Sequence, residues 1–185
     1  MIIESQRIEG NRLSWILRCP IEYDAFELSE LRIKIDGETE NLDRESGEAF
    51  LSPKNFEKII VEDSMAKKTL FFVAEVDGKI VGFARCEGSK LSRFAHKAEF
   101  GICISKEYWS CGIGKVLLEN ILMWADAVGI KKISLNVLQT NTKAIQLYKR
   151  YGFTEEGLLL NDRFHKDGNY YNTVVMGRFT VKSYL

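Results

Sequence analysis

A glycine-bearing segment in the middle of the chain is the first candidate for chemistry. Residues 109–115 read WSCGIGK and lie between a predicted strand, 98–105, and a predicted amphipathic helix, 113–128. Backbone N–H groups at the start of a helix have no partner within it and carry partial positive charge. Glycines let a ligand approach that main chain closely, and Lys115 adds a cation, so the segment predicts a diphosphate site. Glycines that serve turn geometry alone are the alternative.

Two familiar phosphate-binding motifs do not match this segment. A Walker-type loop has glycine where Trp109 stands, and Ser or Thr where Val116 stands. A dinucleotide-binding fingerprint has a third glycine where Leu117 stands and an acidic residue at the end of the next strand, where Leu138 and Gln139 stand. The segment therefore belongs to neither class.

A second segment, residues 141–153, reads NTKAIQLYKRYGF and follows a predicted strand at 133–138. Asn141 stands where a helix is predicted to begin, and asparagine is a preferred N-cap residue. Tyr148 lies two turns later and carries a phenol that can donate a proton. The alternatives are an asparagine that only caps the helix and a tyrosine that only packs against the core.

Together, the two segments resemble the GNAT superfamily of N-acetyltransferases. The loop of that family reads Arg/Gln-x-x-Gly-x-Gly/Ala, and its next strand and helix carry Asn-x-x-Ala-x-x-x-Tyr followed by Gly-Phe. The resemblance extends from about Trp15 to Met176, although the N-terminal third matches in element order alone. Trp109 departs from the formula, which puts a side-chain contact in doubt but not the cofactor, because backbone N–H groups supply most phosphate contacts in this family.

The resemblance implies a fold and an activity. The fold is α/β, with a mixed, mostly antiparallel twisted sheet of about seven strands, helices on both faces, and a splayed pair of parallel strands that holds acetyl-CoA. One N-acetyltransferase domain is expected over residues 1–185, with its core at 15–177. The activity is transfer of acetyl from acetyl-CoA to a primary amine of a small molecule in a ternary complex, without a metal or an acyl-enzyme. Acetylation of a protein N-terminus or lysine, and a non-catalytic acyl-CoA-binding module, are the alternatives.

The resemblance also implies the site residues. The cofactor-binding set is Ile102, Cys103, Ile104, Trp109, Ser110, Cys111, Gly112, Ile113, Gly114, Lys115, Asn141 and Tyr148. Tyr148 is in addition the expected proton donor to the departing thiolate. A thiol at a helix start has a lowered pKa, but neither histidine lies near Cys111 in sequence, so a nucleophilic role for it is not expected.

Glu99 is the candidate general base, acting directly or through a water. A free primary amine has a pKa of about 10 and is mostly protonated at neutral pH, so some group must accept its proton. Strand parity, which a β-bulge would reverse, decides whether Glu99 points into the site. An ordinary exposed strand residue is the alternative.

Two further regions bear on the acceptor. The acidic stretch 36–48 is either a solvated loop or an overhang that favours cationic amines. On the last strand, Tyr170, Tyr171 and Asn172 border the acceptor side in the resembling fold.

Short-range patterns predict the elements that position these residues. A strand is expected at 14–18, a helix from Tyr23 and Phe26 to a stop at Gly37, and a helix from Ser52-Pro53 toward Met65. Strands at 70–76 and 79–86 form a hairpin around Asp77-Gly78. After the segments described above, strands at 156–164 and 170–179 close the domain.

Composition excludes several classes of protein. Lys plus Arg total 26 and Asp plus Glu total 26, so no net charge favours nucleic acid or anionic lipid. The four cysteines form no C-x-x-C pair, and neither a zinc site nor a disulfide framework is expected. Charged residues interrupt the first ten positions, and no apolar run reaches bilayer length, so we expect a cytoplasmic protein without membrane partners. A monomer and a homodimer are both left open.

Overall fold

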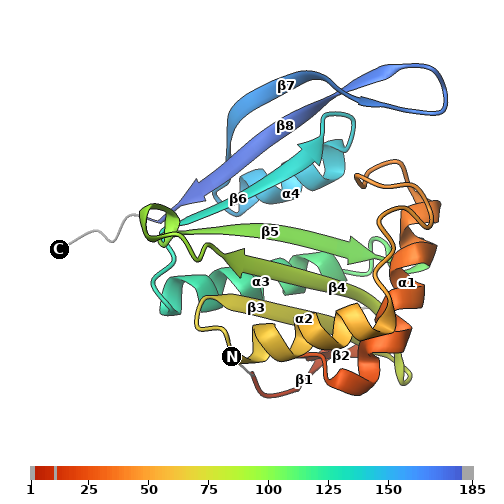
Figure 1. The fold of residues 1–185 in the computed structure, drawn as a ribbon, viewed down its shortest axis with the longest axis vertical. Coiled ribbons are helices and arrows are strands. Elements are labelled where there is room, and N and C mark those ends of the chain that lie inside the picture. The colour runs from red at the N-terminus through yellow and green to blue at the C-terminus, as the bar shows by residue number, and fades with distance from the viewer. Residues whose placement is uncertain (1–2, 11, 181–185) are drawn as a thin grey trace.

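The computed structural model describes residues 3–10 and 12–180. Eight strands in this part of the chain form one sheet in the order β1-β2-β3-β4-β5-β6-β8-β7 (Figure 1). Every neighbouring pair is antiparallel except β5 and β6, which are parallel. The strands are β1 Gln6–Glu9, β2 Ser14–Arg18, β3 Thr69–Val76, β4 Lys79–Gly88, β5 Lys97–Ile104, β6 Lys132–Leu138, β7 Thr154–Phe164 and β8 Tyr170–Phe179. This confirms the expected mixed α/β fold and adds β1, which the sequence patterns did not predict.

Helices cover both faces of the sheet. The α-helices are α1 Ala25–Glu38, α2 Pro53–Met65, α3 Ile113–Ala127 and α4 Thr142–Arg150, and the 3-10 turns are η1 Glu22–Asp24, η2 Ser92–Phe94 and η3 Lys106–Tyr108. The apolar residues of α3 and α4 share one buried cluster with one face of the sheet, and those of α1 and α2 share a second cluster with the other face. In Figure 1, α2 accordingly lies in front of the sheet and α3 behind it. No helix within the described ranges is long and apolar enough to cross a bilayer.

Helix α1 differs from its sequence prediction in the face that it buries. Tyr23 and Phe26 are 95% and 67% exposed, whereas Leu28, Leu31 and Ile35 are buried. These three residues recur at intervals of three and four, which is the more continuous apolar stripe. The expected stop at Gly37 is also wrong. The helix continues to Glu38, and a Cβ on residue 37 would lie 3.2 Å from the Cβ of Ser46 in the loop that packs over it.

Local signals elsewhere were reliable. Ser52 caps α2 by accepting a hydrogen bond from the Asn55 N–H at 3.3 Å, and Pro53 is the first helical residue. Asp77 and Gly78 have φ angles of 49° and 75°, as a tight hairpin turn requires. The predicted bounds of β8 match those observed.

Candidate active site

Strands β5 and β6 pair along only part of their length. Their parallel register covers Lys97 to Glu99 on β5 and Lys132 to Ser134 on β6. Beyond these residues, β5 continues against β4 and β6 continues against β8, so the two strands diverge, as Figure 1 shows. We call this divergence the wedge. Its inner edges keep main-chain groups that a continuous ladder would have paired.

The hydrogen-bond alternation of β5 shows which groups face the wedge. The Ser105 N–H donates to the Val81 C=O at 2.9 Å, which directs Ser105 toward β4. In an antiparallel ladder every second residue points to the same neighbour, so Cys103 also faces β4. The backbone groups of Ile102 and Ile104 therefore face the wedge. Their expected role in holding an extended ligand stays a prediction.

The same rule applies to β6. The Gln139 N–H donates to the Asn172 C=O at 2.9 Å, so residue 139 faces β8. The backbone groups of Asn136 and Leu138 therefore point toward the wedge. The Leu138 C=O already accepts the Asn141 N–H at 2.9 Å. Sequence reasoning had not selected Asn136 or Leu138, because their contribution is main chain and depends on where pairing stops.

The glycine loop, residues 109–115, stands at the start of α3. Gly112 caps the helix with φ 87°, and Ser110 also has a positive φ of 62°. The Val116 N–H donates to the Gly112 C=O at 3.2 Å, so the three N–H groups between them have no acceptor within the helix. A Cβ on Gly114 would lie 3.2 Å from the Ile104 Cδ1, which shows that glycine allows α3 to pack closely on β5. A Cβ on Gly112 would meet nothing within 4 Å, so the main chain there is open to a ligand.

The side chains of the glycine loop make local contacts. The Trp109 indole N–H donates to the Ile104 C=O at 2.7 Å and ties the loop to the end of β5. The Cys111 thiol donates to the Trp109 C=O at 3.7 Å. Lys115 is 3.8 Å from Glu119, one turn along α3. Trp109 therefore has a positioning function where the family formula has a side chain for phosphate.

Asn141 occupies its predicted helix start. Its side chain accepts a hydrogen bond from the Ala144 N–H at 3.3 Å, which is an N-cap. The cap places Asn141 directly after the β6 edge of the wedge. The cap is thus confirmed, and the cofactor contact stays a prediction.

Tyr148 brings a phenol to the face of the sheet that carries α3 and α4. Its ring packs edge-on to Phe100, with centroids 6.3 Å apart, and lies 5.7 Å from the ring of Phe153. Burial raises the pKa of Tyr148, and the nearby Cys103 thiol raises it further. The hydroxyl makes no hydrogen bond within the described ranges. It is nevertheless not sealed from solvent, since the sealed and unpaired side-chain atoms there do not include it. It is therefore a reachable proton donor.

Glu99 lies on the opposite face of the sheet from Tyr148. Phe100 is buried in the cluster that includes Tyr148, and the β4–β5 register is continuous from Gly88↔Ala98 to Gly82↔Ile104, so no bulge reverses the parity. Glu99 is exposed and is the last paired residue before the wedge opens. The structure thus separates the two candidate catalytic groups, which lie on opposite faces of the sheet at the wedge.

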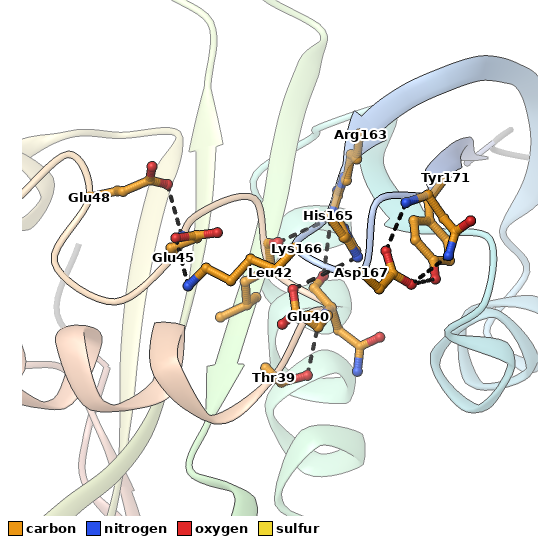
Figure 2. A network of polar contacts seen from close by, with 12 residues as sticks. Thr39, Glu40, Leu42, Glu45, Glu48, Arg163, His165, Lys166, Asp167 and Tyr171 are labelled. Atoms are coloured by element: carbon orange, nitrogen blue, oxygen red, sulfur yellow. Dashed lines mark hydrogen bonds and ion pairs between the residues drawn. The ribbon is translucent and has the colours of Figure 1, made fainter.

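The loop between α1 and α2 is joined to the β7–β8 hairpin near the open end of the wedge (Figure 2). Arg163 donates to the Asn41 C=O at 3.4 Å and the Leu42 C=O at 3.2 Å, and it also pairs with Asp43. Two further pairs follow along the hairpin: His165 with Glu40 at 3.8 Å, and Lys166 with Glu45 at 2.9 Å. We call these contacts the hairpin–loop interface.

A cavity of about 290 Å³ lies beside this interface. It is lined by Glu40, Asn41, Leu138, Thr140, His165, Lys166, Asp167 and Tyr171. Since residues 138 and 140 directly precede Asn141, the cavity adjoins the β6 edge of the wedge. Of the three β8 residues expected at the acceptor side, Tyr171 lines the cavity, stacking on His165 at 4.4 Å, whereas Tyr170 packs on Phe164.

The acidic stretch is not an open anionic surface. Each of its carboxylates within 36–48 has a partner: Asp36 with Arg44, Glu38 with the Lys106 N–H, Glu40 with His165, Asp43 with Arg163, Glu45 with Lys166, and Glu48 with the Glu45 N–H. The expectation that this stretch overhangs the acceptor entrance and favours cationic amines stays a prediction. Two cations of the hairpin, Arg163 and Lys166, oppose two of the six carboxylates, Asp43 and Glu45. Within the described ranges, no group of His, Cys, Asp and Glu has the arrangement of a metal site.

Comparison with known proteins places these features in a wider set. The model of the Acetyltransferase (GNAT) family matches residues 38–153. L-amino acid N-acetyltransferase AaaT of Escherichia coli (strain K12) is 34% identical over 86 residues, which cover 46% of this chain and 53% of that protein. Spermidine N(1)-acetyltransferase of the same strain is 30% identical over 130 residues, 70% of this chain and 67% of that protein. The chain therefore spans about half of the first relative's length.

Solved structures agree with the fold over nearly all of the chain. An acetyltransferase of the GNAT family from Streptococcus pneumoniae has a TM-score of 0.86 at 26% identity and covers 90% of this chain and 99% of its own. The structure of yncA, a putative acetyltransferase from Salmonella typhimurium with its cofactor acetyl-CoA, has a TM-score of 0.79 at 16% identity, covering 92% and 96%.

Proposed function

Because this chain belongs to the GNAT acetyltransferase family, we propose that it transfers the acetyl group of acetyl-CoA to a primary amine of a small molecule in a ternary complex. The observation that carries the proposal is the wedge beside the glycine loop. Unpaired main-chain groups on two diverging strands meet a helix start whose first N–H groups are free. A long ligand with a diphosphate at one end and an amide-containing arm at the other matches this combination.

The residues present fit acetyl-CoA, which supplies an activated acyl group as a thioester. The N–H groups of residues 113–115 would bind the diphosphate. The inward backbone groups of Ile102 and Asn136 and the N–H of Ile104, whose C=O already accepts from Trp109, would bind the arm. An amide on the β5 edge would polarise the acyl carbonyl, as an oxyanion hole does. We assign Asn141 a hydrogen bond to the cofactor in addition to its cap.

The catalytic assignments place one proton transfer on each face of the sheet at the wedge. Glu99 would accept the proton of the amine, directly or through a water, from the face that carries α1 and α2. Tyr148 would donate a proton or a hydrogen bond to the departing sulfur from the other face. Burial raises the pKa of Tyr148, so its phenol stays protonated at neutral pH and is available as a donor.

The remaining expectations are also proposed. One sheet contains strands from Gln6 to Phe179, which supports a single domain. All four cysteines are free, which favours a reducing compartment such as the cytoplasm. We propose a monomer or a homodimer that needs no nucleic acid or membrane partner.

Calorimetry with acetyl-CoA, followed by a thiol-release assay, tests the proposal. We expect measurable binding, then release of coenzyme A with at least one member of a panel of amino acids, polyamines, aminoglycosides and short peptides. Release with peptides alone would favour acetylation of protein instead. Binding without release would favour the non-catalytic module. No heat of binding at millimolar acetyl-CoA would refute the cofactor site itself.

A further inference from the structure

Arg32 is a buried cation that makes no ion pair or hydrogen bond with a carboxylate of the described residues. It lies on the sheet-facing side of α1, between the buried residues Leu28 and Ile35, and exposes 9% of its surface. Its guanidinium donates to the Ala49 C=O at 2.7 Å, and it makes no second hydrogen bond within residues 3–10 and 12–180. A guanidinium has five N–H donors, so most of its capacity is unused.

The neighbouring Arg44, in contrast to Arg32, has a carboxylate partner. Its guanidinium donates to both oxygens of Asp36, at 3.0 and 3.1 Å, and so forms a bidentate ion pair. Arg44 thereby occupies the carboxylate of Asp36, which lies one helical turn after Arg32 and would otherwise be its nearest partner on α1. Burial lowers the pKa of Arg32, the charge of Arg44 lowers it further, and the nearby Asp36 carboxylate acts in the opposite direction. A carboxylate that bound Arg32 directly would stabilise its charged form further.

The unused donors of Arg32 are reachable from solvent. Within residues 3–10 and 12–180, the side-chain nitrogen and oxygen atoms that are both sealed and unpaired are Trp124 Nε1 and Thr173 Oγ1. The unpaired nitrogens of Arg32 are not among them, although the residue as a whole is buried. Each of them therefore keeps some contact with solvent, and a small ligand group can take the place of that solvent.

The position of Cys103 relates Arg32 to the wedge. The Cys103 side chain packs against the cluster of Leu28 and Ile35, on the β5 strand that edges the wedge. Arg32, Arg44 and Tyr148 are all close enough to Cys103 for their electrostatic interaction with its thiol to be felt. Arg32 thus lies on the face of β5 that α1 covers, and Tyr148 lies on the opposite face.

We propose that Arg32 binds a carboxylate of the acceptor, and hence that the acceptor of this enzyme is an amino acid or a similar amine that carries an acidic group. The inference rests on the proposed function and specifies its substrate class. Planar guanidinium and carboxylate groups match in a bidentate arrangement. Of the nearby carboxylates, Asp36 is held by Arg44, and Asp43 and Glu45 of the α1–α2 loop pair with Arg163 and Lys166.

This assignment separates three acceptor classes. A free amino acid presents a carboxylate two bonds from its amine. A peptide N-terminus presents an amide at that position, and a polyamine presents further positive charge. Placing a second cation beside buried Arg32 is unfavourable, since like charges in a poorly solvated site repel strongly. The order of reactivity should therefore be amino acid, then amide, then polyamine.

The test compares matched acceptors on the unmodified protein. For alanine, leucine and phenylalanine, kcat/KM is measured for the free acid, its amide, and the amine without the carboxyl group, at saturating acetyl-CoA. The values are expressed per concentration of unprotonated amine, because the three compounds differ in amine pKa. We expect the free acid to exceed the amide by about 10- to 100-fold, the range for hydrogen bonds to a charged group.

Substitutions at Arg32 then test whether this residue causes the preference for the free acid over the amide. Arg32→Met should abolish the advantage of the free acid and leave the amide and the amine within about twofold of their original values. Arg32→Lys keeps the charge, loses the bidentate fork and should retain part of the advantage. Lys58→Met, on the exposed side of α2, is the matched control and should change none of the ratios. Melting temperatures identify any variant that fails to fold through loss of the Ala49 contact.

A second readout does not need turnover. Calorimetry of the coenzyme A-bound protein should detect N-acetylleucine but not N-acetylleucinamide, and Arg32→Met should remove that difference. Equal rates for acid and amide, or an equal loss for all acceptors in Arg32→Met, would overturn the assignment while leaving the proposed function intact. Failure of acetyl-CoA to bind would remove both.

Discussion

The glycine loop and the hairpin–loop interface flank the same wedge, but different kinds of contact build them. On the cofactor side, residues 109–115 follow β5 directly and offer main-chain N–H groups. On the acceptor side, Arg163 and Asn41 are 122 residues apart in the chain and meet through side-chain contacts. The cofactor side therefore depends on backbone conformation, and the acceptor side on which charges oppose one another.

This difference explains why relatives of one fold have names that cite different acceptors. A diphosphate and an extended arm can be bound by backbone groups that almost any side chain leaves in place. An acceptor is discriminated by a few side chains at the ends of long loops, which change at little cost to the core. We therefore expect substitutions on the two sides to separate into changes in acetyl-CoA affinity and changes in acceptor KM.

Tyr148→Phe should give the largest effect, because it removes the proposed proton donor and keeps the ring packing. We expect kcat to fall by about 10- to 1000-fold, with acetyl-CoA affinity unchanged in calorimetry. Tyr151→Phe, which removes the hydroxyl of a partly buried tyrosine that donates to Glu119, is the control. Unchanged turnover would exclude Tyr148 from the mechanism.

The pH dependence adds a second check on Tyr148. Its working form is the protonated phenol, and burial raises its pKa above the usual value of about 10. A raised pKa extends the protonated range upward, so the wild-type rate should not fall on the alkaline side until the pH exceeds 10. An alkaline limb near pH 8 or 9 would assign the loss to another group.

Glu99→Gln tests the proposed general base on the acceptor side. At neutral pH we expect kcat/KM to fall by about 10- to 100-fold, because a protonated amine cannot attack. The deficit should shrink as the pH approaches the pKa of the amine, where the base is no longer needed. Glu87→Gln is the matched control, since Glu87 lies directly opposite Glu99 on β4. A deficit that stays constant with pH would contradict a role as base.

Gly112→Ala tests the backbone basis of the cofactor side. The new methyl group enters open space at a residue with φ 87°, and we expect acetyl-CoA affinity to fall by about 10-fold. Gly129→Ala imposes the same strain at the other end of α3, where φ is 78° and the space is also open. Both variants should lose similar stability, and only Gly112→Ala should lose affinity. Equal affinities would contradict diphosphate binding at this loop.

Arg163→Gln should have the smallest effect and should act on the acceptor alone. It removes the contacts to the carbonyls of Asn41 and Leu42 and the pair with Asp43, so the loop beside the cavity is held less firmly. We expect the acceptor KM to rise by about threefold, without a change in acetyl-CoA affinity. Arg178→Gln, at the far end of β8 against Asp126, is the control. A change in cofactor affinity would show that the two sides are coupled.

Much of the cofactor side was predictable because its determinants are local. The cap at Asn141, the glycine at residue 112 and the apolar stripe of α3 each act within a few residues of their own position. The same locality gave the hairpin at Asp77-Gly78 and the bounds of β8. Short β1 carries too few residues for such a pattern and was missed.

What the sequence by itself determined is therefore the order of the elements, the helix starts and the family of the glycine loop. The tertiary structure decided where β5 and β6 stop pairing, which face Glu99 occupies, and that Arg44 pairs with Asp36 while Arg32 donates to the Ala49 C=O alone within the described residues. The physical reason is range. Caps, turns and apolar periodicity are set by neighbours in the chain, whereas a wedge or an ion pair is set by which distant segments compete for the same partner.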